Sequence, residues 1–278
     1  MPAAMATNGT RQIAVGKDAL DALYDRYNRR ECAHPDPVEF LYDYEDPRDR
    51  EIVGFLGASL AYGRVAMIMR SVASVLARMG DRPAGTSPSA FLMNASREEL
   101  SRAFAGFRHR FATGEEVAAL LWGLKRLMER HGSLNACFAA HLGASDETVV
   151  PALAPFSEEL RDAAEGLNGH LLPCPARGSA CKRLNLFLRW MVRRDAIDPG
   201  GWVGVSPAQL VVPLDTHMHR ICGALGLTAR SQADLRTALE VTDALRRFAP
   251  EDPVRYDFAI SHLGIRGRVE RARWVIRL

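Results

Sequence analysis

Disulfide pairs, membrane-length apolar runs and lysine are scarce or missing in this sequence. Its five cysteines are odd in number and show no Cys-x-x-Cys spacing, which argues against a disulfide framework and favours reduced thiols. No run of about 18 apolar residues is free of charge, so no membrane span is predicted. The first dozen residues show neither a long apolar run nor an Arg-rich amphipathic pattern, so we expect no targeting segment. Together these features predict a cytoplasmic protein.

Lysine is so rare that each one invites a chemical explanation. Of the 36 basic residues only three are lysines, and the other 33 are arginines. Lys17 and Lys125 lie in ordinary polar surroundings, whereas Lys182 begins a strongly amphipathic segment. A partly buried lysine can lose its proton and form a Schiff base, which arginine cannot do. Lys182 is therefore a candidate nucleophile; the alternative is a lysine whose stem packs on a helix while its ammonium stays in water.

The net charge of +3 is unevenly distributed along the chain. Residues 1–176 carry 19 basic and 23 acidic side chains, whereas residues 177–278 carry 17 and 10. A basic C-terminal third favours binding to a polyanion, most simply a nucleic acid. A solvated arginine-rich face would give the same count.

Helical periodicity dominates, and no strand is predicted. A hydrophobic content of 47% offsets the ordering entropy and excludes a disordered chain. The spacing of apolar residues predicts about ten helices, over 18–30, 38–44, 49–79 with a break at Gly63, 115–131, 134–142, 149–167, 180–194, 216–225, 231–248 and 253–264. Residues 81–89 and 168–179 are rich in proline, glycine or serine and are expected to be loops. We expect a single all-α protein over 1–278, with two helical subdomains (approximately 15–170 and 171–278) and a cleft between them.

Asp215 is the second candidate for chemistry. It follows the apolar run Val211-Val-Pro-Leu214 and stands where a helix is predicted to begin. Its simplest role is to cap that helix. The same position would also fix the carboxylate near a cleft. Together with the amine of Lys182, a fixed carboxylate can displace a leaving base from a sugar carbon.

Several segments resemble a known superfamily. Lys182 followed by an apolar helix, and Pro213-Leu-Asp-Thr-His217 with Arg220, are similar to the helix-hairpin-helix DNA glycosylases. The 33 residues from Lys182 to Asp215 and the Lys182-x-x-x-x-Phe187 helix start look more like the archaeal 8-oxoguanine glycosylase branch. The whole chain looks closer still to an uncharacterised bacterial family distantly related to that branch, through 34–37, 61–63, 213–217 and 252–258.

The resemblance implies roles for particular residues. Lys182 would be the Schiff-base nucleophile, Asp215 the catalytic carboxylate, and Asp257 a group that holds the flipped base. An Asp257 paired with an arginine such as Arg255 or Arg266 is an equally weighted alternative. Aromatic residues available for the base are Tyr62, Phe187, Trp190 and Trp202, and DNA-backbone contacts would come from Arg177, Gly178, Arg183, Arg193, Arg194 and Arg220.

The sequence departs from the superfamily pattern in two places. Only Gly178 of the usual Gly-x-Gly hairpin is clearly present, and Ser261 stands where the archaeal branch has an aromatic residue. Cys222 is the only cysteine after Asp215, so we expect no iron–sulfur cluster. We expect no metal site either, because His217 and His219 would point about 200° apart on a helix.

The resulting expectation is a monomeric DNA glycosylase, with or without AP lyase activity. It would remove a damaged base, with an oxidised purine such as 8-oxoguanine as the first candidate, from double-stranded DNA in the cytoplasm at the nucleoid. Two alternatives stay open. One is a non-catalytic DNA-binding protein with a glycosylase-like fold, and the other is a hydrolase or lyase on a nucleotide-like small molecule.

Overall fold

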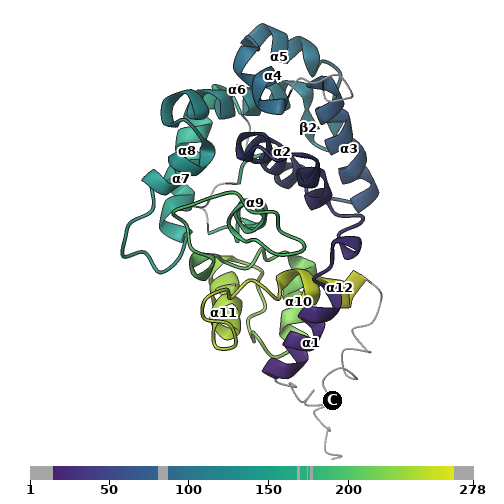
Figure 1. Cartoon of the computed structure of the whole chain (residues 1–278), viewed down its shortest axis with the longest axis vertical. Coiled ribbons are helices and arrows are strands. Elements are labelled where there is room, and N and C mark those ends of the chain that lie inside the picture. The colour runs from purple at the N-terminus through teal and green to yellow at the C-terminus, as the bar shows by residue number, and fades with distance from the viewer. Residues whose placement is uncertain (1–14, 81–86, 168–169, 174, 176–177, 266–278) are drawn as a thin grey trace, which may run out of the picture.

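The protein is built almost entirely of helices (Figure 1). The computed structural model describes residues 15–80, 87–167, 170–173, 175 and 178–265. The α-helices are α1 (Lys17–Tyr27), α2 (Pro47–Ser59), α3 (Val65–Arg78), α4 (Pro88–Asn94), α5 (Arg97–Ala103), α6 (Gly114–His131), α7 (Leu134–Ala140), α8 (Val150–Ala164), α9 (Lys182–Val192), α10 (Thr216–Ala224), α11 (Leu235–Arg246) and α12 (Asp257–Ile265). Short 3-10 turns, η1 (Arg30–Cys32), η2 (Pro37–Asp43) and η4 (Pro207–Gln209), connect some of them. The mostly helical class predicted from the periodicity is confirmed.

Several helix boundaries follow directly from local sequence. The predicted break at Gly63 is confirmed, because this residue adopts φ +101° and separates α2 from α3. Asp46 caps α2 by accepting the N–H of Arg48 at 2.8 Å, and Pro47 takes the first helical position, where no N–H is needed. The start predicted for α11 at Ser231 is wrong, since Asp234 caps the helix through the N–H of Thr237.

Two features between α3 and α6 were not predicted. Helices α4 and α5 are short, but each begins at a serine cap, and Ser96 with Glu99 forms a reciprocal capping box. The sequence also predicted no strand, and this is wrong. The structure contains a small hairpin in which β1 (Arg108–His109) pairs antiparallel with β2 (Ala112–Thr113). Strands of two residues are too short to show an alternating pattern in sequence. The tip of this hairpin is Arg110 and Phe111, and Arg110 has φ +53°.

The packing does not follow the division expected near residue 170. Helix α1, at the N-terminal end, packs against α12, which in turn packs against α10, in the lower part of Figure 1. The hydroxyl of Tyr256 donates to Asp21 at 2.6 Å, and that of Tyr24 donates to Asp195 at 3.1 Å, joining α1 to the C-terminal segments. Helix α9 in turn packs against α2. The first helix therefore belongs with the C-terminal group, and α9 connects this group to the rest.

Close contact between α2 and α9 depends on small residues. A Cβ at Gly54 would lie 3.2 Å from Leu41 and 3.4 Å from Phe187 and Met191, and one at Gly57 would lie 3.6 Å from the ring of Trp190. Larger side chains at Gly54 would push the two helices apart. Both glycines therefore allow α2 to approach α9, which carries Lys182 at its start.

Candidate functional site

The structure brings Lys182 and Asp215 together. Lys182 is the first residue of α9, and Asp215 caps α10. Nζ of Lys182 lies 3.3 Å from Oδ2 of Asp215, and the two side chains are 32% and 40% exposed. A pair this accessible can meet a ligand from solvent. The two candidates chosen from the sequence therefore share one surface site.

The end of α2 supports the start of α9. Nζ of Lys182 also lies 3.5 Å from the carbonyl oxygen of Ala61, and Nη1 of Arg183 donates to the carbonyl of Ser59 at 2.8 Å. Carbonyl groups at a helix C-terminus carry partial negative charge and attract cations. This attraction offsets the unfavourable placement of two cations at the positive end of α9. The junction of the two helices thus holds the Nζ end of the Lys182 side chain.

The carboxylate of Asp215 is fixed by its own helix. Oδ1 accepts the N–H groups of His217 and Met218 at 2.9 and 2.8 Å. Burial acts to raise the pKa of Asp215, but the Lys182 charge and these N–H groups outweigh it and hold that pKa below its ordinary value. Asp215 is accordingly an anion at neutral pH, with Oδ2 turned towards the lysine.

Tyr62 lies on the loop next to this pair. It follows Ala61, is half-buried, and donates its hydroxyl to the carbonyl of His109 at 3.1 Å. Its ring packs edge-on against the His109 ring at 4.7 Å and lies 5.2 Å from the guanidinium of Arg183. Tyr62 therefore links the site to the β1–β2 hairpin, with its hydroxyl already engaged.

The hairpin tip contributes two residues that sequence reasoning missed. Phe111 is 64% exposed and stacks on His170 at 5.6 Å, while Arg110 is exposed and lies next to Gly63. The positive φ of Arg110 holds the tight turn that presents them. No sequence signal placed this turn near Lys182, because the approach of the hairpin to the Gly63 loop is a tertiary contact.

Asp257 does not line an open base pocket. Its side chain is 6% exposed, and Oδ2 pairs with Nη1 of Arg189. Arg189 also donates to Asp198 at 3.1 Å. Burial acts to lower the pKa of Arg189, yet the facing carboxylates of Asp198 and Asp257 raise it overall. The expected base-binding role is therefore not supported, whereas the alternative of a pair with an arginine is, with Arg189 as the partner. Arg266 lies outside the described residues.

Of the arginines expected to contact the DNA backbone, two are engaged within the protein. Arg193 is buried and forms ion pairs with Asp195, Asp198 and Asp252. Arg183, half-buried, donates to backbone carbonyls, and burial lowers its pKa. Neither guanidinium is presented to a phosphate, so these two expectations are corrected.

The remaining backbone candidates differ in position. Arg220 is exposed on the second turn of α10, with Nη2 3.2 Å from Nδ1 of His217, and so lies near Asp215. Arg194 is exposed but follows the last turn of α9, at the opposite end from Lys182. Gly178 adopts φ +73°, yet its N–H donates to the carbonyl of Pro175 at 3.0 Å and is already used. Arg177 lies outside the described residues.

The expected stacking residues are core residues. Phe187 and Trp190 are 1% and 0% exposed, and Trp202 is 6% exposed. The ring of Phe187 packs edge-on against Phe55 at 5.0 Å and against Trp202 at 5.2 Å. Phe187 and Trp190 lie on α9, which is buried from Leu184 to Val192 and packs against Gly54 and Gly57 of α2. Of the aromatic residues named from the sequence, Tyr62 is the one that stays partly exposed next to Lys182.

The other two lysines have structural partners. Lys17 pairs with Asp21 one turn further along α1. Lys125 is buried, contrary to the polar surroundings expected for it, and donates to the carbonyls of Met93 and Ala95 at 2.9 and 2.8 Å. Its amine satisfies carbonyls at the end of α4, a task suited to a compact group with three donors. Among the three lysines, only Lys182 is both partly exposed and next to a capping carboxylate.

A second cluster of potential ligands was missed from the sequence. His131, Cys137 and Glu159 gather from α6, α7 and α8, far along the chain from Lys182 and Asp215. The spacing of His131, Cys137 and His141 is a signal that could have pointed to it. Glu159 supplies the remaining oxygen from another helix and carries no local signal.

Comparison with known proteins places the chain in a family. Within the described residues no helix combines the length and apolar character that crossing a membrane requires. No curated protein and no solved structure matches the chain. Residues 36–266 match the family model described as Protein of unknown function (DUF2400). This match covers more than four fifths of the sequence, and the chain therefore belongs to the DUF2400 family.

Proposed function

We propose that this protein is a DNA glycosylase in which Lys182 is the nucleophile and Asp215 the catalytic carboxylate. The observation that carries the proposal is the 3.3 Å approach of Nζ to Oδ2 between residues that are 33 positions apart in sequence. An apo contact of this length is compatible with a proton transfer that tightens when substrate binds. The basic C-terminal third supports a polyanionic substrate.

The proposed reaction begins with a proton transfer. Nζ of Lys182 gives a proton to Oδ2 of Asp215, and its lone pair then forms a bond to C1′ of the damaged nucleotide. The glycosidic C1′–N bond breaks, and the base leaves with that electron pair and takes up a proton. This proton is the one that Asp215 received from Lys182, so the carboxylate regains its negative charge as the base departs and stabilises the positive charge on the sugar. A lysine amine is required because arginine cannot supply a free lone pair.

The covalent intermediate decides whether the strand is cut. Ring opening expels O4′ and leaves an iminium that joins Nζ to C1′. Hydrolysis of this iminium releases the enzyme, whereas loss of a C2′ proton expels the 3′ phosphate and gives lyase activity. An oxidised purine such as 8-oxoguanine is the first substrate to examine, in double-stranded DNA at the nucleoid. The base must leave the duplex stack to reach Lys182, which lies on the protein surface.

Three exposed arginines near the site are available for phosphates. Arg220 follows Asp215 on α10, Arg64 follows Gly63, and Arg110 lies at the hairpin tip beside that glycine. They take the place of Arg183 and Arg193, which are engaged inside the protein. Phosphate contacts of this kind set the position of the duplex without reading its sequence.

Borohydride trapping tests the proposal. Duplex oligonucleotides that each carry 8-oxoguanine, uracil, thymine glycol or an abasic site are incubated with the protein, with and without borohydride. A covalent adduct with wild type that disappears in Lys182→Arg supports the proposal, because arginine keeps the charge but cannot form the imine. Lys17→Arg is the matched control, since Lys17 also pairs with an aspartate on the surface. The absence of adduct and of base release on every lesion would contradict the proposal.

A non-catalytic DNA-binding protein is the second candidate function. Two observations favour this function. The N–H of Gly178 already donates to the carbonyl of Pro175, and the side chains of Phe187 and Trp190 are buried. Such a protein would bind duplex with the same affinity in wild type and Lys182→Arg, and would release no base from either. An enzyme on a nucleotide-like small molecule would instead show substrate binding that does not fall steeply with added salt.

A further inference from the structure

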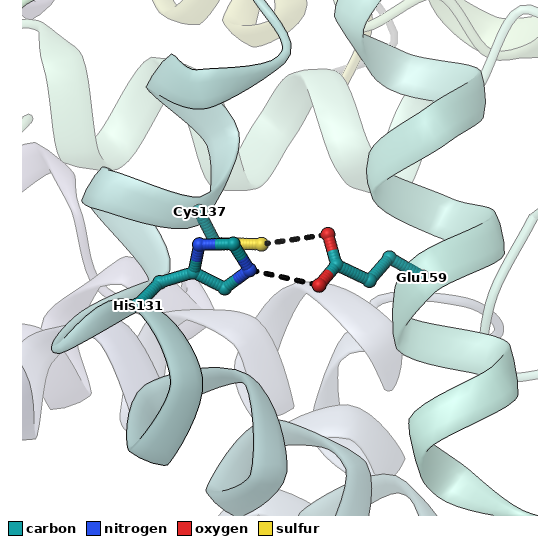
Figure 2. Close-up of side chains that lie close together, drawn as sticks. All are labelled: His131, Cys137 and Glu159. Atoms are coloured by element: carbon teal, nitrogen blue, oxygen red, sulfur yellow. Dashed lines mark hydrogen bonds and ion pairs between the residues drawn. The ribbon is translucent and has the colours of Figure 1, made fainter.

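Glu159 is surrounded by nitrogen and sulfur atoms from two other helices (Figure 2). His131 ends α6, Cys137 lies in α7, and Glu159 lies in α8. Nε2 of His131 lies 2.8 Å from Oε1 of Glu159, and Sγ of Cys137 lies 3.7 Å from Oε2. The three ligand atoms of this cluster lie within 4.8 Å of one another. Three elements thus present an imidazole, a thiol and a carboxylate to one point.

We infer that His131, Cys137 and Glu159 bind one zinc ion. A tetrahedral zinc site places sulfur about 2.3 Å and nitrogen or oxygen about 2.0–2.2 Å from the metal, so its ligand atoms are roughly 3.3–3.8 Å apart. The 3.7 Å between Sγ of Cys137 and Oε2 of Glu159 falls within this range, and the 2.8 Å between Nε2 of His131 and Oε1 of Glu159 falls below it. Small rotations of the side chains would bring the three atoms to the required spacing without moving the helices.

The chemistry of the donor set favours zinc over hard cations. Calcium and magnesium prefer oxygen ligands, whereas a thiolate with an imidazole and a carboxylate suits zinc. A thiolate and a carboxylate together balance the charge of a divalent ion, and imidazole adds none. The ion and its three ligands together are then electrically neutral, which suits the burial of Cys137. With three protein ligands, a water molecule completes the tetrahedron.

Solvent can reach the cluster. Glu159 and His131 retain 17% and 22% of their side-chain exposure, while Cys137 is fully buried. The ion would therefore enter from the side of the carboxylate and imidazole, with the sulfur at the inner end. An entry path of this kind is required of any functional metal site.

Two neighbours hold the carboxylate in place. Nε2 of His141 lies 2.9 Å from Oε2 of Glu159, and Nη1 of Arg130 lies 2.6 Å from Oε1. A carboxylate has lone pairs for several partners, so both contacts can coexist with a metal bond. Partners of this type orient metal ligands, and their removal weakens metal binding. His141 and Arg130 are therefore positioning residues.

The site would add a metal link between three helices that Glu159 already joins through its contacts with Arg130, His131 and His141. Helix α6 packs against both α7 and α8. Helix α7 is tied to α2 by Glu51, whose carboxylate accepts the N–H groups of Leu134 and Asn135 at 3.0 and 2.8 Å. An ion bound by Glu159 would add a second anchor in the middle of this short helix, at Cys137. The inference is independent of the proposed activity on DNA.

Metal binding is tested with zinc chloride and cobalt chloride on the full chain after EDTA treatment and dialysis. We expect one zinc ion per chain by elemental analysis, and a Tm that rises with zinc concentration. Cobalt should give a thiolate-to-metal charge-transfer band that zinc abolishes. This spectrum requires no variant, so it stays informative even if a substitution impairs folding.

Variants then assign the ligands. Cys137→Ser and Glu159→Gln should each lose the zinc and the cobalt–thiolate band, whereas His141→Gln should weaken zinc binding about 10- to 100-fold. Matched controls are Cys32→Ser, a partly exposed thiol elsewhere, and His34→Gln, an imidazole that pairs with Glu39 at 2.9 Å on the surface. Both controls should bind zinc as wild type does. Wild-type protein without a thiolate band, or Cys137→Ser with unchanged zinc content, would overturn the inference.

Discussion

Asp215 divides its carboxylate between a helix cap and Lys182. Oδ1 accepts two backbone N–H groups at the start of α10, whereas Oδ2 faces Nζ of Lys182 at 3.3 Å. The cap fixes the carboxylate relative to the backbone, so the place of Oδ2 does not depend on the ion pair. A lysine that gives up its proton would still find the carboxylate in position.

Two substitutions at Asp215 separate these roles. Asparagine caps helices about as well as aspartate, so Asp215→Asn should leave the free energy of unfolding nearly unchanged, whereas Asp215→Ala should lower it by about 0.5–2 kcal/mol. Both should lose base excision, because both lack the negative charge. Urea unfolding and excision on lesion-bearing duplex measure the two effects. Full excision activity in Asp215→Asn would show that the carboxylate is only a cap.

The effect of Lys182 on stability should depend on pH. The folded-state pKa of Asp215 is depressed by Lys182 and the capping N–H groups against the effect of burial, so its stabilising contribution is present above the unfolded pKa. That contribution is lost as the pH falls through the folded pKa. The difference in unfolding free energy between wild type and Lys182→Met should therefore be largest near neutral pH and shrink below about pH 4. Denaturant unfolding over pH 2–7 measures it, and a constant difference would argue against coupling of the pair.

Arg220 and Arg194 provide a matched test of the proposed DNA-binding surface. Both are exposed, but Arg220 lies near Asp215 and Arg194 follows the far end of α9. Arg220→Ala should weaken duplex binding similarly on all sequences and reduce the salt slope by about 1. Arg194→Ala should change neither. Binding titrations at several salt concentrations measure the slopes, and equal effects of the two variants would contradict this placement of the duplex.

Trp190 should act through packing alone. Its side chain is fully buried against α2, so Trp190→Phe should lower the free energy of unfolding by about 0.5–3 kcal/mol. Excision by the folded protein should stay at the wild-type level. Tyr62→Leu is the comparison variant. Tyr62 lies half-buried beside Lys182, so this substitution, unlike Trp190→Phe, should reduce excision. If Trp190→Phe reduced excision at unchanged stability, a direct role in base binding would have to be reconsidered.

The buried pair of Arg189 and Asp257 should be costly to break. Asp257→Asn leaves part of the buried Arg189 charge uncompensated, and breaking a buried pair in this way typically lowers the free energy of unfolding by about 3–5 kcal/mol. Because Arg189 keeps its contact with Asp198, we expect a loss near the lower end of this range. Asp243→Asn is the control, since Asp243 is 66% exposed and pairs with Arg246 one turn away. Its removal should cost no more than about 1 kcal/mol. Thermal and urea unfolding compare the two, and similar small losses would show that the buried pair contributes little.

Much of the fold was predictable because its determinants are local. The apolar spacing of residues 115–131 anticipates α6, the glycine at 63 anticipates the break between α2 and α3, and Asp215 anticipates the start of α10. Each depends on residues within a turn or two of chain. The β1–β2 hairpin and helices α4 and α5 escaped prediction because their segments are too short to show a period.

Burial of polar and aromatic side chains was harder to predict. Arg193 and Arg194 are neighbours in a basic segment, yet one is enclosed by three aspartates and the other faces solvent. Asp257 likewise lies in a plausible motif but pairs with an arginine on another helix. Which arginine meets water depends on what packs over it, and the packing partners are distant in sequence.

The sequence by itself determined the helical class, a helix over 180–194 that carries Lys182, and the cap at Asp215, since helix formation and capping depend on adjacent residues. Only the tertiary structure decided that Nζ of Lys182 meets Oδ2 of Asp215, and that Glu159 meets His131 and Cys137. Side-chain clusters of this kind form where separate helices pack, and the packing is set by the whole apolar core. The candidate site and the inferred zinc site therefore both depend on contacts between helices that are distant in sequence, and the local sequence of one helix does not indicate its partner.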